Sequence, residues 1–197
     1  MAKQEVRLPD LKGSITEVGE RYPNLANDDL FVLWFLRAYI TDNEHQAAES
    51  IVGGKGDKNI DAVLIDDAAA TVFIVQGKYR QSLGTKSENR SDVQAFADVA
   101  HRICDKSESS FREYLDKMED LTAARIKQAR AKIRGKRPYR LRLFYVTLWK
   151  VSPTNRKDAE LSVRRAPCDS AIDIIDHRRS MIVLRDYLDG VAPPIPT

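Results

Sequence analysis

The sequence predicts an α/β fold in which helices flank a mixed β-sheet. Two apolar segments, residues 60–66 and 71–78, are separated by a four-residue turn and predict an antiparallel hairpin. Helical segments precede and follow this hairpin, and a further apolar segment at 140–149 predicts another strand. Helices on both sides of a short mixed sheet are typical of a single α/β domain.

The length and composition of the chain also fit one domain. Its 197 residues, 43% of them hydrophobic, are enough to enclose one sizeable core. We expect a loosely packed arm at 1–27, the domain itself at 28–190 and a linker-like tail at 191–197. The net charge of +3 is too small to indicate a polyanionic partner by itself, so the distribution of charge matters more.

Cysteine usage and hydropathy bear on the compartment. Cys104 and Cys168 are far apart and neither belongs to a CxxC pair, so we expect neither a disulfide framework nor a zinc site. The N-terminus has no apolar signal region, and the most apolar run, at 31–36, is too short to span a membrane. These features predict a soluble protein of the reducing cytoplasm that has no membrane partner.

The elements follow in order along the chain. A short helix at 14–22 is expected inside the arm. Asn27, Asp28 and Asp29 cap a largely buried helix that extends to residue 40, and a second helix at 44–52 ends at a Gly-Gly pair. After the hairpin, the pattern predicts helices at 91–104 and 108–134, the strand at 140–149, and a short strand or helix within 170–190, with a helix favoured at 179–190.

The predicted hairpin register brings three polar residues together. A four-residue turn places Asp66 opposite Thr71, and continued pairing then places Asp61 opposite Gln76. Residues directly opposite each other share a face, as do residues two apart on one strand, so Asp61, Gln76 and Lys78 should converge. A one-residue bulge would move Asp61 to the other face.

These residue types suit a hard divalent cation. Mg²⁺ prefers oxygen ligands and usually keeps several waters, so a carboxylate, an amide oxygen and a backbone carbonyl can be its whole protein shell. A neighbouring lysine can assist an attacking water or stabilise charge on a phosphate. The chemistry indicated is phosphodiester hydrolysis with Mg²⁺ or Mn²⁺. The alternative is an ordinary strand-end acid in a salt bridge with Lys78.

The spacing of Asp61 and the segment Gln76-Gly77-Lys78 resembles the PD-(D/E)XK nuclease core in its QxK form. The stretches LFVLWFLRAY, GGKGDKNIDAVLID and FIVQGKY are similar to the N-terminal region of abortive-infection phage-resistance (AIPR) proteins, with the resemblance strongest over residues 28–80. The resemblance implies a restriction-endonuclease-like fold in which Asp61, Gln76 and the Gly77 carbonyl hold the metal and Lys78 serves the nucleophile. Gln76 is neutral where most of the superfamily has a carboxylate, which implies weaker metal binding.

The superfamily often adds an acid from the first core helix. Glu49 is our first candidate for this ligand, and Glu44 and Asp29 are alternatives. Asp57, in the loop before Asp61, either approaches the metal or shapes the turn.

Nine basic residues and no acids occur between residues 125 and 142. Charge runs are usually solvated faces. The alternative is a ridge that follows a nucleic-acid backbone, for which the candidate residues are Lys132, Arg134, Lys136 and Arg137. Tyr79 and Arg80, which follow Lys78, either contact a phosphate or cap the strand.

The residues and the resemblance together predict a metal-dependent nuclease that acts on DNA rather than RNA, and the resemblance implies a role in phage defence. A non-catalytic nucleic-acid-binding or assembly module is the second hypothesis, and a structural or oligomerising domain is the third. A homodimer remains open. We expect the chain to be the N-terminal part of a longer protein with further C-terminal domains, the alternative being a stand-alone form.

Overall fold

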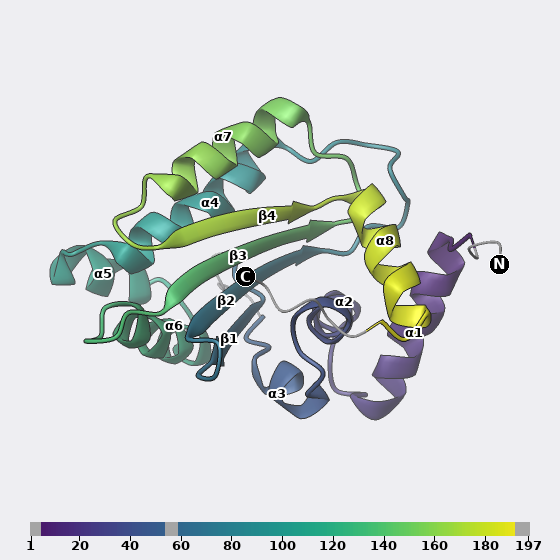
Figure 1. Cartoon of the computed structure of the whole chain (residues 1–197), viewed down its shortest axis with the longest axis horizontal. Coiled ribbons are helices and arrows are strands. Elements are labelled where there is room, and N and C mark those ends of the chain that lie inside the picture. Colours follow the sequence, from purple (N-terminus) through teal and green to yellow (C-terminus); the bar gives the residue numbers. More distant parts are fainter. Residues whose placement is uncertain (1–4, 54–58, 192–197) are drawn as a thin grey trace.

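The structure, a computed structural model, describes residues 5–53 and 59–191. Its centre is a four-stranded sheet in the order β1 (Ala62–Asp66), β2 (Thr71–Lys78), β3 (Arg140–Thr147) and β4 (Ser170–Ile175) (Figure 1). β1 pairs with β2 antiparallel, and the other two pairs are parallel. The predicted mixed α/β sheet with an antiparallel hairpin is confirmed.

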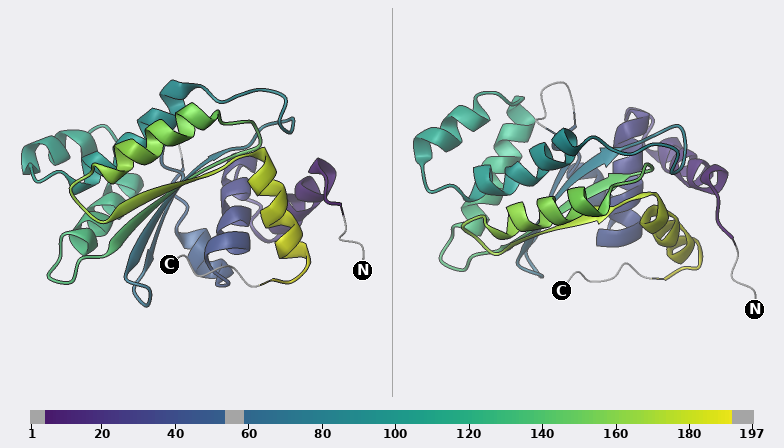
Figure 2. Two further views of the ribbon diagram at one scale, coloured as in Figure 1. Left: turned by 45° about the horizontal axis from the view of Figure 1, so that its top comes forward. Right: turned by 90° about the horizontal axis from the view of Figure 1, so that it is seen from above.

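The helices form one layer on each face of this sheet, as Figures 1 and 2 show. One layer contains α4 (Arg90–Cys104), α5 (Glu108–Leu115), α6 (Asp120–Ile133) and α7 (Pro153–Arg164). The other contains α1 (Leu8–Arg21), α2 (Asn27–Phe35), the π-helix η1 (Leu36–Ile40), α3 (Glu44–Glu49) and α8 (His177–Leu188). Within the described ranges, no helix has both the length and the apolar character needed to cross a bilayer.

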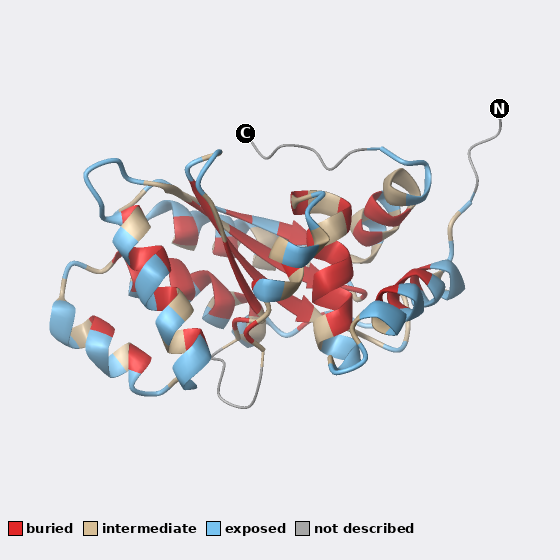
Figure 3. Cartoon of the chain, turned by 90° about the horizontal axis from the view of Figure 1, so that it is seen from below, coloured by how far each residue is buried: buried red, intermediate tan, exposed pale blue. Residues whose placement is uncertain are grey.

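Alternation along the central strands creates a separate core on each face. On β2, Val72 and Ile74 face the α4 layer, whereas Phe73 and Val75 face the α2 layer. β2 and β3 are buried almost throughout, as expected for strands that are covered on both sides (Figure 3). Gln76, two residues after Ile74, therefore lies on the α4 face, and Gly77 lies on the α2 face.

The hairpin register agrees with the sequence over β1. Asp66 pairs with Thr71, and pairing continues without interruption to Ala62 and Val75. The turn at 67–70 has the expected four residues, and Ala70 adopts a left-handed conformation with φ of 48°.

Several predicted elements need correction. The arm is not loosely packed, because Leu11, Ile15 and Val18 recur on one side of α1 and are buried against the α2 layer. The predicted helix at 108–134 is two helices, α5 and α6, which both direct apolar residues at the α4 core. The helix predicted at 44–52 ends at Glu49, since Ile51 pairs with Ala62 in an extended bridge. Helix α7 was not predicted.

The expectation for the cysteines is wrong. Cys104, at the end of α4, and Cys168, in the loop between α7 and β4, form a disulfide with Cα atoms 5.9 Å apart. Their separation of 64 residues hides this proximity in the sequence. The two residues meet because α4 and α7 pack side by side on one face of the sheet.

Candidate active site

Gly77 allows helix α2 to approach β2 closely. A Cβ atom at this position would overlap the Cγ2 atom of Val32 and contact the ring of Phe31. A larger residue between Gln76 and Lys78 would therefore displace the Val32 side chain of α2. The close packing of α2 fixes the backbone of this segment.

Asp61 lies one residue before β1, at a β-bulge. Its amide donates a 2.9 Å hydrogen bond to the Val75 carbonyl, although Ala62 is the ladder partner of Val75. Its carbonyl accepts a 2.9 Å hydrogen bond from Val52 on the other side. Two residues that oppose one residue of the neighbouring strand define a bulge. The predicted direct pairing of Asp61 with Gln76 is therefore wrong.

The Asp61 carboxylate contacts the Gly77 backbone. Asp61 Oδ2 accepts a 2.7 Å hydrogen bond from the Gly77 amide, so the carboxylate takes the place of a backbone carbonyl at the end of the ladder. In an antiparallel pair, the N–H and C=O groups of one residue point to the same neighbouring strand. The Gly77 carbonyl is thus directed to the same strand end as the Asp61 carboxylate.

Gln76 carries a buried amide oxygen that has no hydrogen-bond partner among the described residues. The residue is 1% exposed, and its Oε1 atom accepts no hydrogen bond within the described part of the chain. An unsatisfied buried acceptor costs about 1–3 kcal/mol. Tyr145 is the neighbour of Gln76 on β3 and is also fully buried. Burial, together with nearby Glu88, raises the pKa of the Tyr145 hydroxyl.

Lys78 ends β2 beside Thr147 of β3. It is half-buried, and its ammonium group makes no hydrogen bond or ion pair with any described residue. The salt bridge between Asp61 and Lys78 that the sequence left open is therefore not formed. Lys78 follows Gly77 directly in the chain, which makes its ammonium group a candidate partner for an anion at this strand end.

The structure distinguishes among the candidates for an additional acid. Glu49 lies on the exposed side of α3 and pairs with His45 at 3.2 Å. Glu44 forms ion pairs with Arg21 and Arg37. Asp57 lies outside the described residues.

Asp29 is a candidate acid that lies close to the Asp61 segment. A Cβ atom at Gly53 would be 2.5 Å from Asp29 Oδ1 and 3.8 Å from the Asp61 Cα atom. Gly53 therefore lies between Asp29, in the first turn of α2, and Asp61, and only its backbone fills the space there. The geometry favours Asp29 over Glu49.

A buried carboxylate that the sequence did not reveal lies beyond Lys78. The Glu88 side chain is 1% exposed and accepts hydrogen bonds from Arg80 at 2.7 and 3.0 Å and from the Thr147 hydroxyl at 2.5 Å. The Arg80 guanidinium also lies 4.2 Å from the centre of the Trp149 ring. Glu88 sits in a polar loop without periodicity, so nothing in the sequence marks it as buried.

The two residues proposed for phosphate contact near Lys78 are used in packing. Arg80 pairs with Glu88, and this pairing raises the pKa of its guanidinium. Tyr79 packs against Phe31 with ring centres 5.4 Å apart, and burial raises its pKa. Both observations fit the alternative in which these residues secure the end of the strand.

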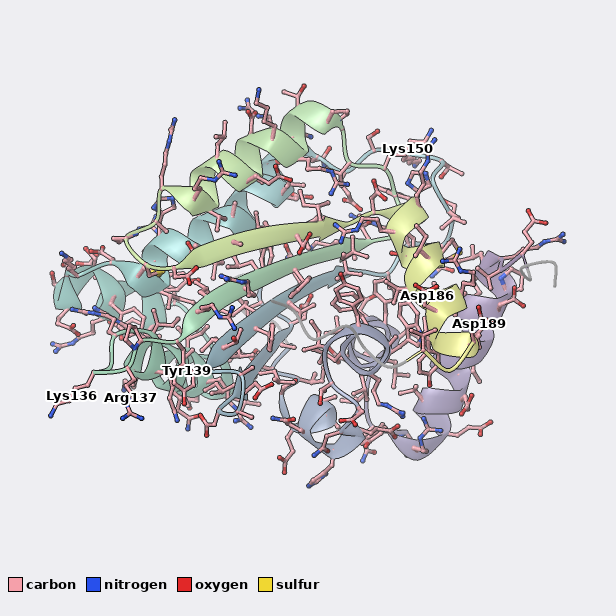
Figure 4. All side chains as sticks on the ribbon, in the orientation of Figure 1. Lys136, Arg137, Tyr139, Lys150, Asp186 and Asp189 are labelled. Atoms are coloured by element: carbon pink, nitrogen blue, oxygen red, sulfur yellow. A yellow bond between two sulfur atoms is a disulfide. The ribbon has the colours of Figure 1, made fainter. Side chains whose placement is uncertain are left out.

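The basic ridge lies at the other end of the sheet. Lys132 binds Asp67, and Arg134 binds Glu108. Lys136 and Arg137 extend from the loop before β3, next to the hairpin turn, whereas Lys78 lies at the opposite end of β2 (Figure 4). The eight residues of β2 separate the two regions by about 23 Å.

The donor set near Asp61 consists only of oxygens. In the part of the chain that the structure describes, no three His, Cys, Asp or Glu side chains are grouped to hold a metal ion. The candidate ligands for a cation are the Asp61 carboxylate, the Gly77 carbonyl and the buried Gln76 amide oxygen, with waters completing the shell. Such a set fits Mg²⁺ or Mn²⁺ better than it fits a softer metal.

Comparisons of the chain with family models, with curated proteins and with solved structures give no match.

Proposed function

We propose that the domain is a metal-dependent nuclease with a restriction-endonuclease-like core. One observation carries this proposal: the Asp61 carboxylate is held on the amide of Gly77, which stands in the chain between Lys78 and Gln76, whose buried amide oxygen has no partner among the described residues. A buried acceptor without a protein partner can be satisfied by a bound ligand. The motif resemblance to QxK nucleases agrees with this interpretation.

Each residue has a distinct role in the proposal. Asp61, Gln76 and the Gly77 carbonyl bind the cation, and Asp29 supplies a further carboxylate through water. When bound, Mg²⁺ or Mn²⁺ would polarise a phosphoryl oxygen and lower the pKa of a water. Lys78 orients the attacking water and stabilises the negative charge that develops on the phosphate.

DNA is the proposed substrate and phage defence the proposed setting. Both come from the resemblance to AIPR proteins, and the lysine at the strand end supports a phosphodiester as the group attacked. A homodimer and additional C-terminal domains belong to the same proposal.

A second candidate function is a nucleic-acid-binding module without catalysis. It is favoured by the neutral Gln76 and by the lack of a three-acid cluster among the described residues. In this case the pocket is vestigial and the basic residues perform the function.

The decisive experiment is a cleavage assay on plasmid DNA with Mg²⁺ or Mn²⁺. The nuclease proposal expects divalent-dependent nicking that Lys78→Ala abolishes while DNA binding is retained. Lys150→Ala is the matched control, since Lys150 is an exposed lysine at the same end of the sheet. No cleavage by the wild type, or equal loss in both variants, would favour the binding module.

A further inference from the structure

Helix α6 connects the candidate active site with the basic loop. At its first turns, the Thr122 hydroxyl binds the Val52 carbonyl at 3.0 Å and Arg125 binds the Glu49 carbonyl at 2.8 Å. Val52 itself is bonded to Asp61. The helix therefore begins beside the strand segment that holds Asp61.

The other end of α6 reaches the hairpin turn. Lys132 Nζ lies 2.7 Å from Asp67 Oδ1, and Tyr139 donates a 2.8 Å hydrogen bond to the same carboxylate. The chain then continues into the exposed loop that carries Lys136 and Arg137. Fourteen helical residues span about 21 Å, so α6 covers most of the distance between the two regions.

Positive charge along this path is in excess. Nine basic residues lie between 125 and 142. Among the described residues, they form ion pairs with only three carboxylates, those of Asp67, Glu108 and Asp169. Arg125 binds a neutral carbonyl. Lys127, Lys136 and Arg137 are exposed and form no ion pair with a described residue. These three residues leave exposed positive charge along the path without an acidic partner among the described residues, and such charge attracts a polyanion.

The segment from residue 119 to residue 142 offers little aromatic surface on which bases could stack. Tyr139 is the only aromatic residue between 119 and 142. Its hydroxyl is bound to Asp67, and Lys132 lies 5.1 Å from the centre of its ring. Single-stranded nucleic acids usually bind through base stacking on aromatic side chains, whereas duplexes are held through their phosphates.

We propose that α6 and the following loop form a track for the phosphate backbone of double-stranded DNA, leading away from the Asp61 site. The role of the track in cleavage rests on the proposed function, but its binding does not. At 3.4 Å per base pair, α6 alone corresponds to about six base pairs. The substrate class is thus a duplex that extends beyond the cleavage site.

The test is a titration of fluorescently labelled duplex DNA of about 16 base pairs, more than twice the span of α6. It uses the whole chain in EDTA, so that no cation at Asp61 contributes. The double variant Lys136→Ala/Arg137→Ala should bind more weakly, and the slope of log affinity against log salt should become less negative by about 1.8, which corresponds to the loss of two phosphate contacts. The matched control is Arg164→Ala/Arg165→Ala, two exposed basic residues at the end of α7.

Each outcome decides the proposal. A weaker and less salt-dependent interaction only in the loop variant, with single strands of the same length bound more weakly than duplex, supports the track. An equal effect in the α7 control, tighter binding of single strands, or stronger binding to anionic lipid vesicles than to duplex would overturn it. Loss of binding in the loop variant without any cleavage by the wild type would refute the nuclease and leave the track standing.

Discussion

The carboxylate of Asp61 accepts a 2.7 Å hydrogen bond from the amide of Gly77, and this contact fixes the acid at the end of the hairpin ladder. A bulge makes the contact, because it moves Asp61 out of register with Gln76. The carboxylate therefore lies against the peptide that links Gln76 to Gly77, instead of opposite the Gln76 side chain.

Substituting Asp61 by Asn should separate structure from metal binding. The amide oxygen can still accept from Gly77, so the free energy of unfolding should fall by only about 1 kcal/mol. The loss of charge should remove any stabilisation by Mn²⁺, measured as the shift of Tm on adding the ion. Asp66→Asn is the control, because Asp66 caps the hairpin turn. A Mn²⁺ shift that survives Asp61→Asn would place the ion elsewhere.

Gly77→Ala should destabilise the domain by about 1–3 kcal/mol, because its Cβ atom would overlap Val32. Urea denaturation measures this loss. The double variant Gly77→Ala/Val32→Ala should lose less stability than the sum of the losses in the two single variants, because Val32→Ala makes room for the new Cβ atom. Gly13→Ala is the control, because nothing lies within 4 Å of a Cβ atom at that helical glycine and the change should be neutral or stabilising. Additive effects at 77 and 32 would contradict the close approach of α2.

Glu88→Ala should be among the most damaging single substitutions near the site. It leaves the Arg80 charge and the Thr147 hydroxyl without the carboxylate that now satisfies them, at a cost of about 3–5 kcal/mol in the free energy of unfolding. The exposed pair of Arg90 and Asp158 gives the comparison, since Arg90→Ala should cost at most about 1 kcal/mol. Similar losses in the two variants would show that Glu88 is not buried in solution.

Stability should decline at alkaline pH because of Tyr145. Burial and Glu88 raise the pKa of its hydroxyl above the usual 10.0, so the unfolded chain releases this proton first. The folded state therefore binds the proton more tightly than the unfolded state. The contribution of Tyr145 to the free energy of unfolding is complete below about pH 10 and is lost as the pH rises above this value. Tyr145→Phe should flatten this alkaline decline in the free energy of unfolding. An unchanged profile would mean that Tyr145 does not contribute to it.

Local patterns in the sequence are sufficient to predict the hairpin and most helices. The turn residues and the apolar alternation set the pairing of Asp66 with Thr71, and the apolar run from Asn27 predicts a buried helix. The division between α5 and α6 has no glycine or proline to mark it. It arises because both helices pack on one core, with Arg130 of α6 bound to Glu108 of α5.

The sequence indicates which residues belong to the candidate site, but it does not predict their geometry. Spacing and strand ends indicate Asp61, Gln76 and Lys78, whereas the bulge depends on how β1 is held between β2 and residues 50–52. The burial of Glu88 and the disulfide of Cys104 depend on contacts between distant segments. Sequence spacing carries no signal for such contacts.

The most direct measurement is anomalous scattering from a crystal soaked in Mn²⁺. The account predicts a peak about 2.0–2.2 Å from the Asp61 carboxylate and the Gly77 carbonyl, close to the usual Mg²⁺–oxygen distance, with Gln76 Oε1 in the same shell. A crystal with full Mn²⁺ exposure and no peak beside Asp61, or with a peak only at other carboxylates, would contradict it.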